Sequence, residues 1–392
     1  MSGLELLPRS VLGPEIPLVG DEDPFRVELR HWLADNATGE PEPLDQDEKV
    51  AMRRAWQRKL FAGGWAGPHW PERLGGRGAG PLQQFMYYEE LALARSPFPA
   101  NTPGIVLLGP TMMVHGTQEL QDRFLPGILS GEEMWCQGFS EPGAGSDLAA
   151  LRAKAVLDGE EWVINGQKTW TTWAKYADWC FVLCRTDPDS ERHRGLTLII
   201  IAMDADGVTE NEIVQISGDP EFSEVFFDDA RTPADLIVGD VGQGWTAAMT
   251  MFGFERGDQG FTDHARTLVW LHDIAEALRG AELSVAERAQ ARDRYADLWI
   301  RTQQLRRLNL GMAVNQQAGE SIGFRGSVVN LFWGELEKEV AELDALVHGA
   351  RGVLAHDPVG HELLSSRQAS IHSGTAEIQR NIIAERILGL PR

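Results

Sequence analysis

The sequence has few lysines, and its charge is strongly negative. Only six of its 392 residues are lysine, and the formal net charge is −22. Nucleic acids and anionic membrane surfaces bind proteins through clustered positive charge. The composition therefore argues against both as general partners. A small anionic ligand still fits, provided that local arginines or backbone N–H groups bind it.

Cysteines are also few, and long apolar runs are missing. Cys136, Cys180 and Cys184 lie among apolar and aromatic residues without CxxC spacing, so we expect reduced core residues, no metal site and no disulfide. The N-terminus lacks a basic segment followed by an apolar one, and the longest apolar run, LTLIIIAM, has the length of a strand. The sequence therefore predicts a cytoplasmic protein with no secretion signal and no membrane insertion.

The hydrophobic residues that are present, 43% of the chain, change their spacing twice. Helical spacing dominates from about residue 23 to residue 135 and again after residue 244. Between these regions, short β-branched or aromatic runs alternate with Gly, Asp and Pro clusters, which is typical of strands and turns. We predict an α+β fold with an N-terminal helical domain (residues 1–134), a middle β-barrel-like domain (135–240) and a C-terminal helical domain (241–392).

The most informative β segment reads FSEPGAGSDLAALRAKAVLDGEEWVINGQKTWTTWA. Gly143, Gly145 and Ser146 form a turn whose N–H groups and hydroxyl could hold an anion or a cofactor edge; a plain turn explains them equally well. Further on, the segment predicts a strand, an Asn-Gly hairpin turn and a second strand. Trp170 and Thr172 would then project from one face. That arrangement suits a flat heterocycle such as a flavin, or ordinary core packing.

Together with the C-terminal HSGTAEIQRNIIAERILGLPR, these motifs resemble the acyl-CoA dehydrogenase family. The resemblance extends from GWAGPHWPERLGGRGAGP to the last residue. It implies an N-terminal helical domain, a middle β domain and a C-terminal four-helix bundle that hold FAD and an acyl-CoA thioester between them. The residues implied to contact FAD are Phe139, Ser140, Ser146, Trp170, Thr172 and Thr375.

The resemblance implies α,β-dehydrogenation, in which a carboxylate removes the α-proton and a hydride passes to flavin N5. Family members commonly carry this base in a YEGT-like loop, where this chain has Ser373. Ser373 cannot act as the base, although its backbone N–H could polarise the thioester carbonyl. The neighbouring His372 is an alternative base, but the family usually has an aromatic residue there that packs on substrate or flavin.

A minority of the family, similar to isovaleryl-CoA dehydrogenase, carries the base in a Glu-Arg pair on the first helix of the C-terminal domain. The segment MTMFGFERG falls there, and Glu255 follows Gly244 by eleven residues, the spacing of that minority. In a helix, Met251 and Phe252, four and three positions earlier, share a face with Glu255. These apolar neighbours would raise the pKa of the Glu255 carboxyl by desolvation. We predict that Glu255 is the catalytic base; a solvated surface glutamate is the alternative. The residues implied to contact the substrate are Ser146, Arg256 and Ser373.

Two elements that complete the flavin site across subunits in family homotetramers are broken here. The Arg-x-x-Phe-Gly element should lie in LVWLHDIAEALRGAELSVAE, which lacks Phe-Gly. The Gln-x-x-Gly-Gly element falls at residues 346–352, LVHGARG, with Leu for Gln and Ala for the second Gly. A heterotetramer with a paralogous subunit, carrying two flavins per four chains, is therefore predicted. The alternative is a homotetramer that uses other cations, such as Arg279 or Arg351.

The resemblance also implies an electron-transferring flavoprotein as the electron acceptor, and the position of the base suggests a branched or bulky acyl group. Three alternatives stay open for this fold. They are an acyl-CoA oxidase, a flavin monooxygenase and a non-catalytic partner subunit of a heteromeric dehydrogenase.

Overall fold

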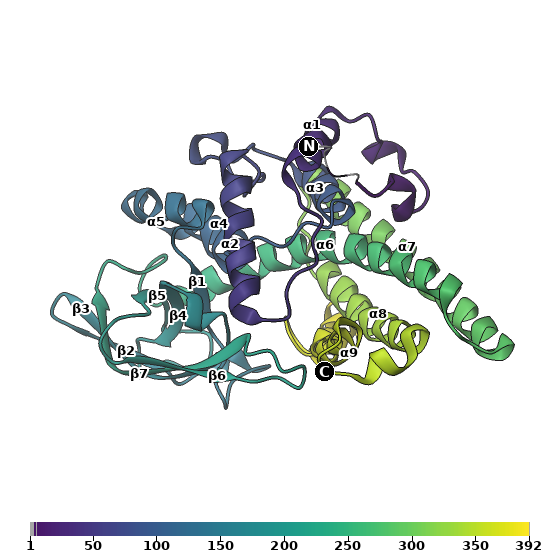
Figure 1. Cartoon of the computed structure of the whole chain (residues 1–392). Helices are drawn as coiled ribbons and strands as arrows, with labels where there is room; N and C mark the ends of the chain where they lie inside the picture. Colours follow the sequence, from purple (N-terminus) through teal and green to yellow (C-terminus); the bar gives the residue numbers. More distant parts are fainter. Residues whose placement is uncertain (1–3, 5, 392) are drawn as a thin grey trace.

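Helices at both ends of the chain flank a curled β-sheet, as Figure 1 shows for the computed structural model. The structure describes residue 4 and residues 6–391, except for the side chains of residue 17 and residues 256–260. The predicted α+β class, with helical N-terminal and C-terminal parts around a β middle, is confirmed. The N-terminal helices are α1 (Pro24–Asn36), α2 (Gln46–Ala62), α3 (Pro81–Leu93), α4 (Gly109–His115) and α5 (Gln118–Ser130), with a π-helical turn at Pro103–Leu108.

Local sequence explains where these helices begin. The Asp23 carboxylate accepts a hydrogen bond from the Phe25 amide, and Pro24 occupies the first turn, where its missing N–H costs nothing. The Gly/Pro/Trp segment between α2 and α3 turns inward: Trp65 and Trp70 are buried, and the Trp70 indole donates to the Ile105 carbonyl at 3.0 Å. This loop is therefore part of the N-terminal core.

The middle part is a seven-stranded mixed sheet in the order β1-β4-β2-β3-β7-β6, with β5 paired to β4. The sheet curls where β2 meets β4, because their pairing is confined to Lys154 opposite Arg185. All three cysteines are buried in this part of the core. The strands are β1 (Trp135–Gly138), β2 (Lys154–Asp158), β3 (Glu161–Thr172), β4 (Trp179–Arg185), β5 (Leu196–Ala202), β6 (Val208–Ile213) and β7 (Phe222–Pro233).

The predicted Asn-Gly hairpin turn is wrong. Strand β3 runs straight through Asn165 and Gly166, and the turn to β2 lies earlier, at Gly159. Gly166 instead lies at an irregularity in the β3–β7 pairing and has a φ of +149°. A Cβ there would lie 2.7 Å from the Ala153 Cα, so only glycine fits. Asn165 binds Asp229 on β7, which ties down the irregular position.

The C-terminal part packs three long helices and two short ones. Helix α7 begins with a capping box, in which the Ser284 hydroxyl accepts from the Glu287 amide and the Glu287 carboxylate accepts from the Ser284 amide. The Trp270 indole on α6 donates to the Asp344 carboxylate on α8 at 2.7 Å. The helices are α6 (Gly244–Gly280), α7 (Val285–Gln317), α8 (Arg325–His348), α9 (Pro358–Ser365) and α10 (Ala376–Ile382).

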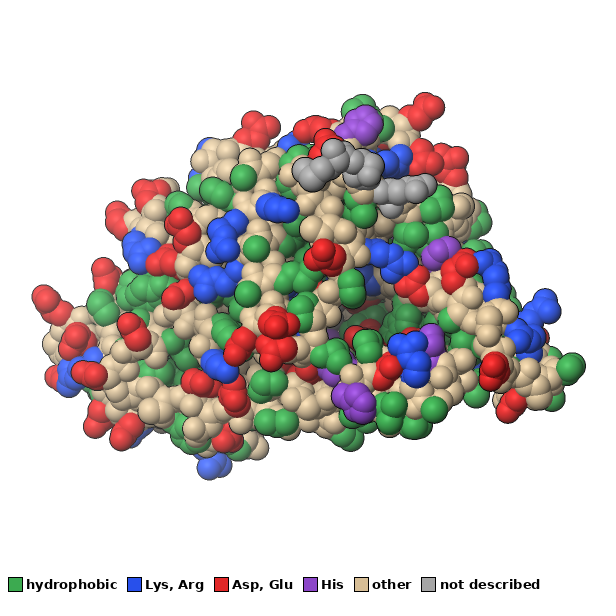
Figure 2. Space-filling view, in the orientation of Figure 1, with side chains coloured by type: hydrophobic (Ala, Val, Ile, Leu, Met, Phe, Trp, Pro, Cys, Tyr) green, Lys and Arg blue, Asp and Glu red, His purple; other side chains and the backbone are tan. Residues whose placement is uncertain are grey.

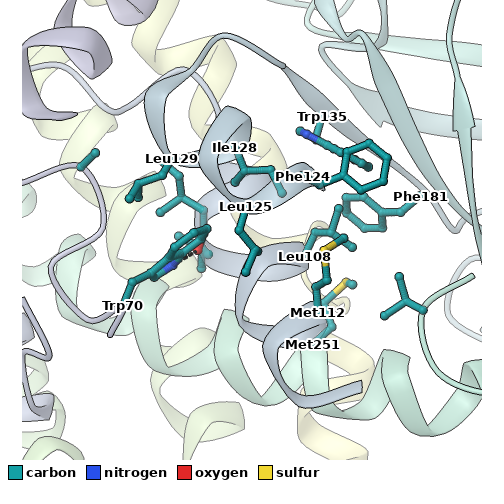
Figure 3. Packing of buried hydrophobic residues seen from close by; sticks show 14 of the residues in the cluster. Trp70, Leu108, Met112, Phe124, Leu125, Ile128, Leu129, Trp135, Phe181 and Met251 are labelled. Atoms are coloured by element: carbon teal, nitrogen blue, oxygen red, sulfur yellow. Dashed lines mark hydrogen bonds between the residues drawn. The ribbon is translucent and has the colours of Figure 1, made fainter. Parts of the chain in front are cut away.

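The largest core cluster crosses all three parts of the chain. Figure 3 shows Trp70 and α5 residues packed towards Trp135 and Phe181 of the sheet, with Met251 of α6 beside Met112. The first two turns of α6 are therefore anchored against both the N-terminal helices and the sheet. Among the described residues, no helix combines the length and apolarity needed to cross a bilayer.

A buried ion cluster joins the N-terminal helices to α7. Glu89 on α3 is fully buried and accepts hydrogen bonds from Arg26 on α1 and from Arg306 on α7, the latter at 2.7 Å. Arg306 also donates to the carbonyls of Leu12 and Pro14. Although burial raises the pKa of Glu89, the His264 imidazole 3.6 Å away and the charges of the two arginines lower that pKa to about 2.

Candidate active site

A cavity of about 660 Å³ lies where the sheet meets the C-terminal helices. Its walls are the turn after β1, the first half of α6, the start of α8 and the segment from residue 373 to residue 386. Five of the predicted site residues, which come from three distant parts of the chain, line it together. They are Phe139, Ser140, Ser146, Glu255 and Ser373.

Glu255 is half-buried and lines this cavity from α6. One turn earlier, Met251 is fully buried in the shared core, so the helix cannot turn its Glu255 face away from the cavity. Phe252 also lines the cavity, with its ring 5.9 Å from that of Phe139. The expected apolar neighbours are thus in place. The backbone of Arg256 belongs to α6, but its side chain lies outside the described part of the structure.

The glycine-rich turn is fixed by a buried ion pair that sequence reasoning missed. The Lys168 ammonium contacts the Glu141 carboxylate at 2.9 Å and donates to the carbonyls of Phe139 and Leu183. Glu141 also accepts from the amides of Arg152 and Ala153. All three donors of the ammonium are therefore used. The one available signal was a lysine, a rare residue here, in the middle of a strand.

Trp170 and Thr172 lie at the end of β3 and do not line the cavity formed by the described residues. Trp170 has a left-handed φ of +58°, and the β3–β7 register shifts between Lys168 and Thr171. The Trp170 side chain is 58% exposed, with its ring 5.9 Å from that of Phe222, whereas Thr171 is fully buried. A large aromatic face is thereby presented beside the half-buried Thr172.

The C-terminal loop is held in an uncommon backbone conformation. Ser373 has a φ of +55°, and its carbonyl, like that of Gly374, accepts a hydrogen bond from the Gln379 side-chain Nε2, at 2.9 and 3.1 Å. Within the described chain, the Ser373 N–H donates to no protein group. It is therefore available to a ligand carbonyl. Thr375 lies just outside the cavity lining, and its hydroxyl caps α10 by accepting from the Ile378 amide.

His372 is a poor proton acceptor at this site. Burial lowers the pKa of its imidazole to about 4. Its Nδ1 lies 3.2 Å from the Ser373 hydroxyl, and its ring is 5.5 Å from that of Trp333. The packing against Trp333 indicates that the ring fills space beside the loop.

Polar and aromatic groups near the glycine-rich turn complete the cavity wall, and the sequence had not singled them out. The His193 ring lies 4.4 Å from that of Trp245, and both residues line the cavity. In the same loop, Arg192 pairs with Asp147, which is also a lining residue, at 3.1 Å. Arg192 thus brings one cationic side chain to the turn, where it pairs with an acid of the cavity wall.

Comparison with known proteins agrees with this arrangement. Family profiles match the acyl-CoA dehydrogenase N-terminal domain at residues 20–132, the middle domain at residues 136–230 and the C-terminal domain at residues 242–388. The chain belongs to the acyl-CoA dehydrogenase family. Acyl-CoA dehydrogenase IpdE1 of Mycobacterium tuberculosis is 42% identical over 388 residues, which cover 95% of this chain and 98% of that relative.

Solved structures of other acyl-CoA dehydrogenases superpose along nearly the whole chain. The Tcur3481-Tcur3483 steroid ACAD has a TM-score of 0.82 at 28% identity and covers 97% of this chain and 99% of that chain. The ChsE4-ChsE5 complex of Mycobacterium tuberculosis has a TM-score of 0.79, with the same identity and coverage. As an acyl-CoA dehydrogenase, the protein is an oxidoreductase that dehydrogenates an acyl-CoA thioester, and its family membership implies FAD.

Proposed function

We propose that Glu255 removes the α-proton of the acyl-CoA thioester during FAD-dependent α,β-dehydrogenation. The observation that carries the proposal is that Glu255 shares one cavity with Ser373, whose backbone N–H is available to the thioester carbonyl. A base aimed at the α-carbon and a donor aimed at the carbonyl oxygen are the two groups that proton removal needs. Anaerobic flavin bleaching by acyl-CoA in the Glu255→Gln enzyme tests the assignment.

The residues predicted to bind FAD carry groups that suit a flavin. Trp170 offers a large exposed aromatic face, and Thr172 offers a hydroxyl beside it. Ser140 and Ser146 line the cavity along the turn held by the Lys168–Glu141 pair. When bound, FAD supplies the hydride acceptor of the reaction. We propose that these residues, together with Phe139 and Thr375, bind and orient it.

We propose an acyl group bulkier than a simple fatty chain. Two lines of support exist: the proposed base lies on α6 instead of the C-terminal loop, and the superposed Tcur3481-Tcur3483 protein is a steroid ACAD. At the loop, Ser373 replaces the longer carboxylate side chain, which leaves room beside His372. The acceptor that we propose for the electrons is an electron-transferring flavoprotein.

Replacing His372 with glutamine is expected to leave most of the dehydrogenase activity. An imidazole whose pKa is lowered to about 4 holds a proton too weakly to serve as the general base at neutral pH. Glutamine keeps a similar length and the capacity to bind the Ser373 hydroxyl. Steady-state turnover and flavin content of the His372→Gln enzyme check this, and a loss as large as that expected for Glu255→Gln would make His372 the base.

We propose that the chain works with a paralogous subunit. The cations that a homotetramer could use in place of the broken elements already have partners: Arg279 pairs with Glu276, and Arg351 pairs with Asp357 at 2.8 Å. The superposed Tcur3481-Tcur3483 and ChsE4-ChsE5 structures are each named for two different chains. A partner that carries Arg-x-x-Phe-Gly and Gln-x-x-Gly-Gly would complete the flavin site.

Expressed alone, the chain is expected to be flavin-poor, poorly soluble or inactive, and co-expression with its partner should restore flavin and activity. A cofactor held by half of its contacts dissociates readily, because its polar groups that lack protein partners are better hydrated in solution. Native mass measurement with a flavin count checks this, with two flavins per four chains as the expected ratio. A homotetramer that is purified alone with four tightly bound flavins would refute the heteromeric assembly.

A further inference from the structure

A buried glutamine on α10 binds the loop that carries Ser373. The Gln379 side-chain Nε2 donates to the Ser373 carbonyl at 2.9 Å and to the Gly374 carbonyl at 3.1 Å. Gln379 belongs to α10 and is only 2% exposed. All three residues contribute to the wall of the cavity. One amide group therefore binds the two peptide carbonyls that follow the Ser373 N–H in the chain.

The loop needs such hydrogen bonds because its backbone is unusual. Ser373 has a left-handed φ of +55°, and Gly374 has a φ of +93°. In this region the Cβ of an L-residue crowds the following carbonyl oxygen, so surrounding contacts have to hold Ser373 there. Figure 2 shows the molecule hollowed between α6 and the C-terminal helices α8 and α9, and Ser373 and Gly374 line the cavity. On its cavity side, the loop therefore depends on hydrogen bonds more than on packing for its direction.

The residues that precede the loop are fixed separately. The Gln368 carbonyl accepts hydrogen bonds from the amides of Ile371 and His372, at 2.8 and 3.1 Å. The chain is thus held by a helical turn up to the His372 amide and by Gln379 from the Ser373 carbonyl onwards. The Ser373 N–H lies between these two anchors, so its direction depends on both.

The other end of the Gln379 amide binds nothing in the described chain. Its Oε1 is buried and accepts no hydrogen bond from a described group. Rotating the amide by half a turn would place Oε1 against two carbonyl oxygens, which offer it no donor, so only the observed orientation suits the loop. A buried acceptor without a partner lowers stability. The side chain is therefore better suited to fixing the loop than to stabilising the fold.

We propose that Gln379 is a positioning residue for the dehydrogenation, which directs the Ser373 N–H at the thioester carbonyl. It acts through the loop and not on the reacting atoms. The proposal rests on the proposed function, in which that N–H polarises the carbonyl. Negative charge on the carbonyl oxygen grows as the α-proton leaves, so a misdirected N–H weakens catalysis more than it weakens binding.

The experiment measures the polarisation of the thioester carbonyl itself. The assembled, flavin-loaded Glu255→Gln enzyme is mixed with cyclohexylpropanoyl-CoA that carries an isotope label at the thioester carbon, and infrared difference spectroscopy records the carbonyl stretch. A hydrogen bond weakens the C=O bond, so the frequency should fall when the ligand binds. Adding Gln379→Met, which has a similar length and no amide, should remove most of that fall. The dissociation constant should change less than about threefold.

Turnover gives a second measurement, with Glu255 in place. Gln379→Met should lower kcat about 10- to 100-fold and leave KM nearly unchanged, because the affected hydrogen bond strengthens in the transition state. Gln368→Met is the matched control, because it makes the same substitution in the preceding turn, where the Gln368 side chain contacts Ser365. It should keep both the frequency fall and the unaltered kcat.

Gln379→Asn serves as a second variant, because its amide is one methylene too short to reach the loop and should give the same losses. An unchanged frequency fall in either Gln379 variant would overturn the proposal, as would failure of both variants to assemble, which would make the residue structural. The proposed function fails differently. No frequency fall in Glu255→Gln alone would refute the Ser373 N–H as the donor, and turnover by Glu255→Gln would refute the base.

Discussion

Replacing Glu255 with glutamine is expected to slow acyl-CoA-driven flavin bleaching more than about 100-fold. Glutamine has nearly the same shape as glutamate, but its amide cannot accept the α-proton. Because α6 is anchored by the buried Met251, the substitution should leave the fold and the flavin content unchanged. Stopped-flow absorbance after anaerobic mixing with acyl-CoA measures the rate on the assembled enzyme.

Glu385 offers a matched control, because it is a second glutamate that lines the same cavity. In Glu385→Gln, flavin bleaching should proceed at close to the rate of the unaltered enzyme, because the proposed mechanism gives Glu385 no part in proton transfer. Bleaching at an unaltered rate in Glu255→Gln would show that another group is the base. A selective loss in Glu385→Gln would identify that group.

Replacing Glu89 with glutamine is expected to destabilise the protein by about 3–5 kcal/mol, because the buried Arg306 loses its counter-charge and the buried Arg26 keeps only Glu90. Glu89 is fully buried and binds both Arg26 and Arg306, so its loss would loosen α1, α3 and α7 together. Urea unfolding followed by circular dichroism measures the change. The exposed Asp158, which pairs with Arg231, provides the control: Asp158→Asn should cost no more than about 1 kcal/mol.

The difference in unfolding free energy between the unaltered protein and Glu89→Gln should depend on pH. The folded pKa of Glu89 is lowered to about 2, against an ordinary value of 4.5. Its stabilising effect is therefore complete above pH 4.5 and disappears as the pH falls towards 2. The stability difference between the unaltered protein and Glu89→Gln should narrow over that range. A difference that stays constant down to pH 2 would show that the carboxylate charge is not what stabilises the cluster.

Hydrophobic spacing was enough to predict the helical and β regions, because each element buries one face against a shared core. It could not predict the turn in the middle sheet. Asn165 and Gly166 have the residue types of a hairpin, but the close approach of Ala153 and the bond to Asp229 decide their conformation. Such contacts are distant in sequence. The domain boundaries at residues 134 and 240 remain predictions, and the main core cluster extends across both.

The part of the site that could be predicted is the base, because few residue types can accept a proton from a thioester α-carbon. Glu255 stood out as a carboxylate in the position of a base, and the structure brings it to one cavity with Ser146 and Ser373. The Lys168–Glu141 ion pair, which fixes the glycine-rich turn, did not stand out, because its two residues lie 27 positions apart. Contacts between side chains that are distant in the sequence become visible only after folding.

The core shown in Figure 3 also sets an order of events during protein synthesis. Leu129 and Met251 belong to the same buried cluster, yet more than a hundred residues separate them. Ribosomes add about 5–20 residues per second, so roughly 6–24 s pass between the two residues. During that interval the N-terminal helices expose the apolar surface that α6 later covers. This part of the core therefore stays incomplete until the segment that carries the proposed base has emerged.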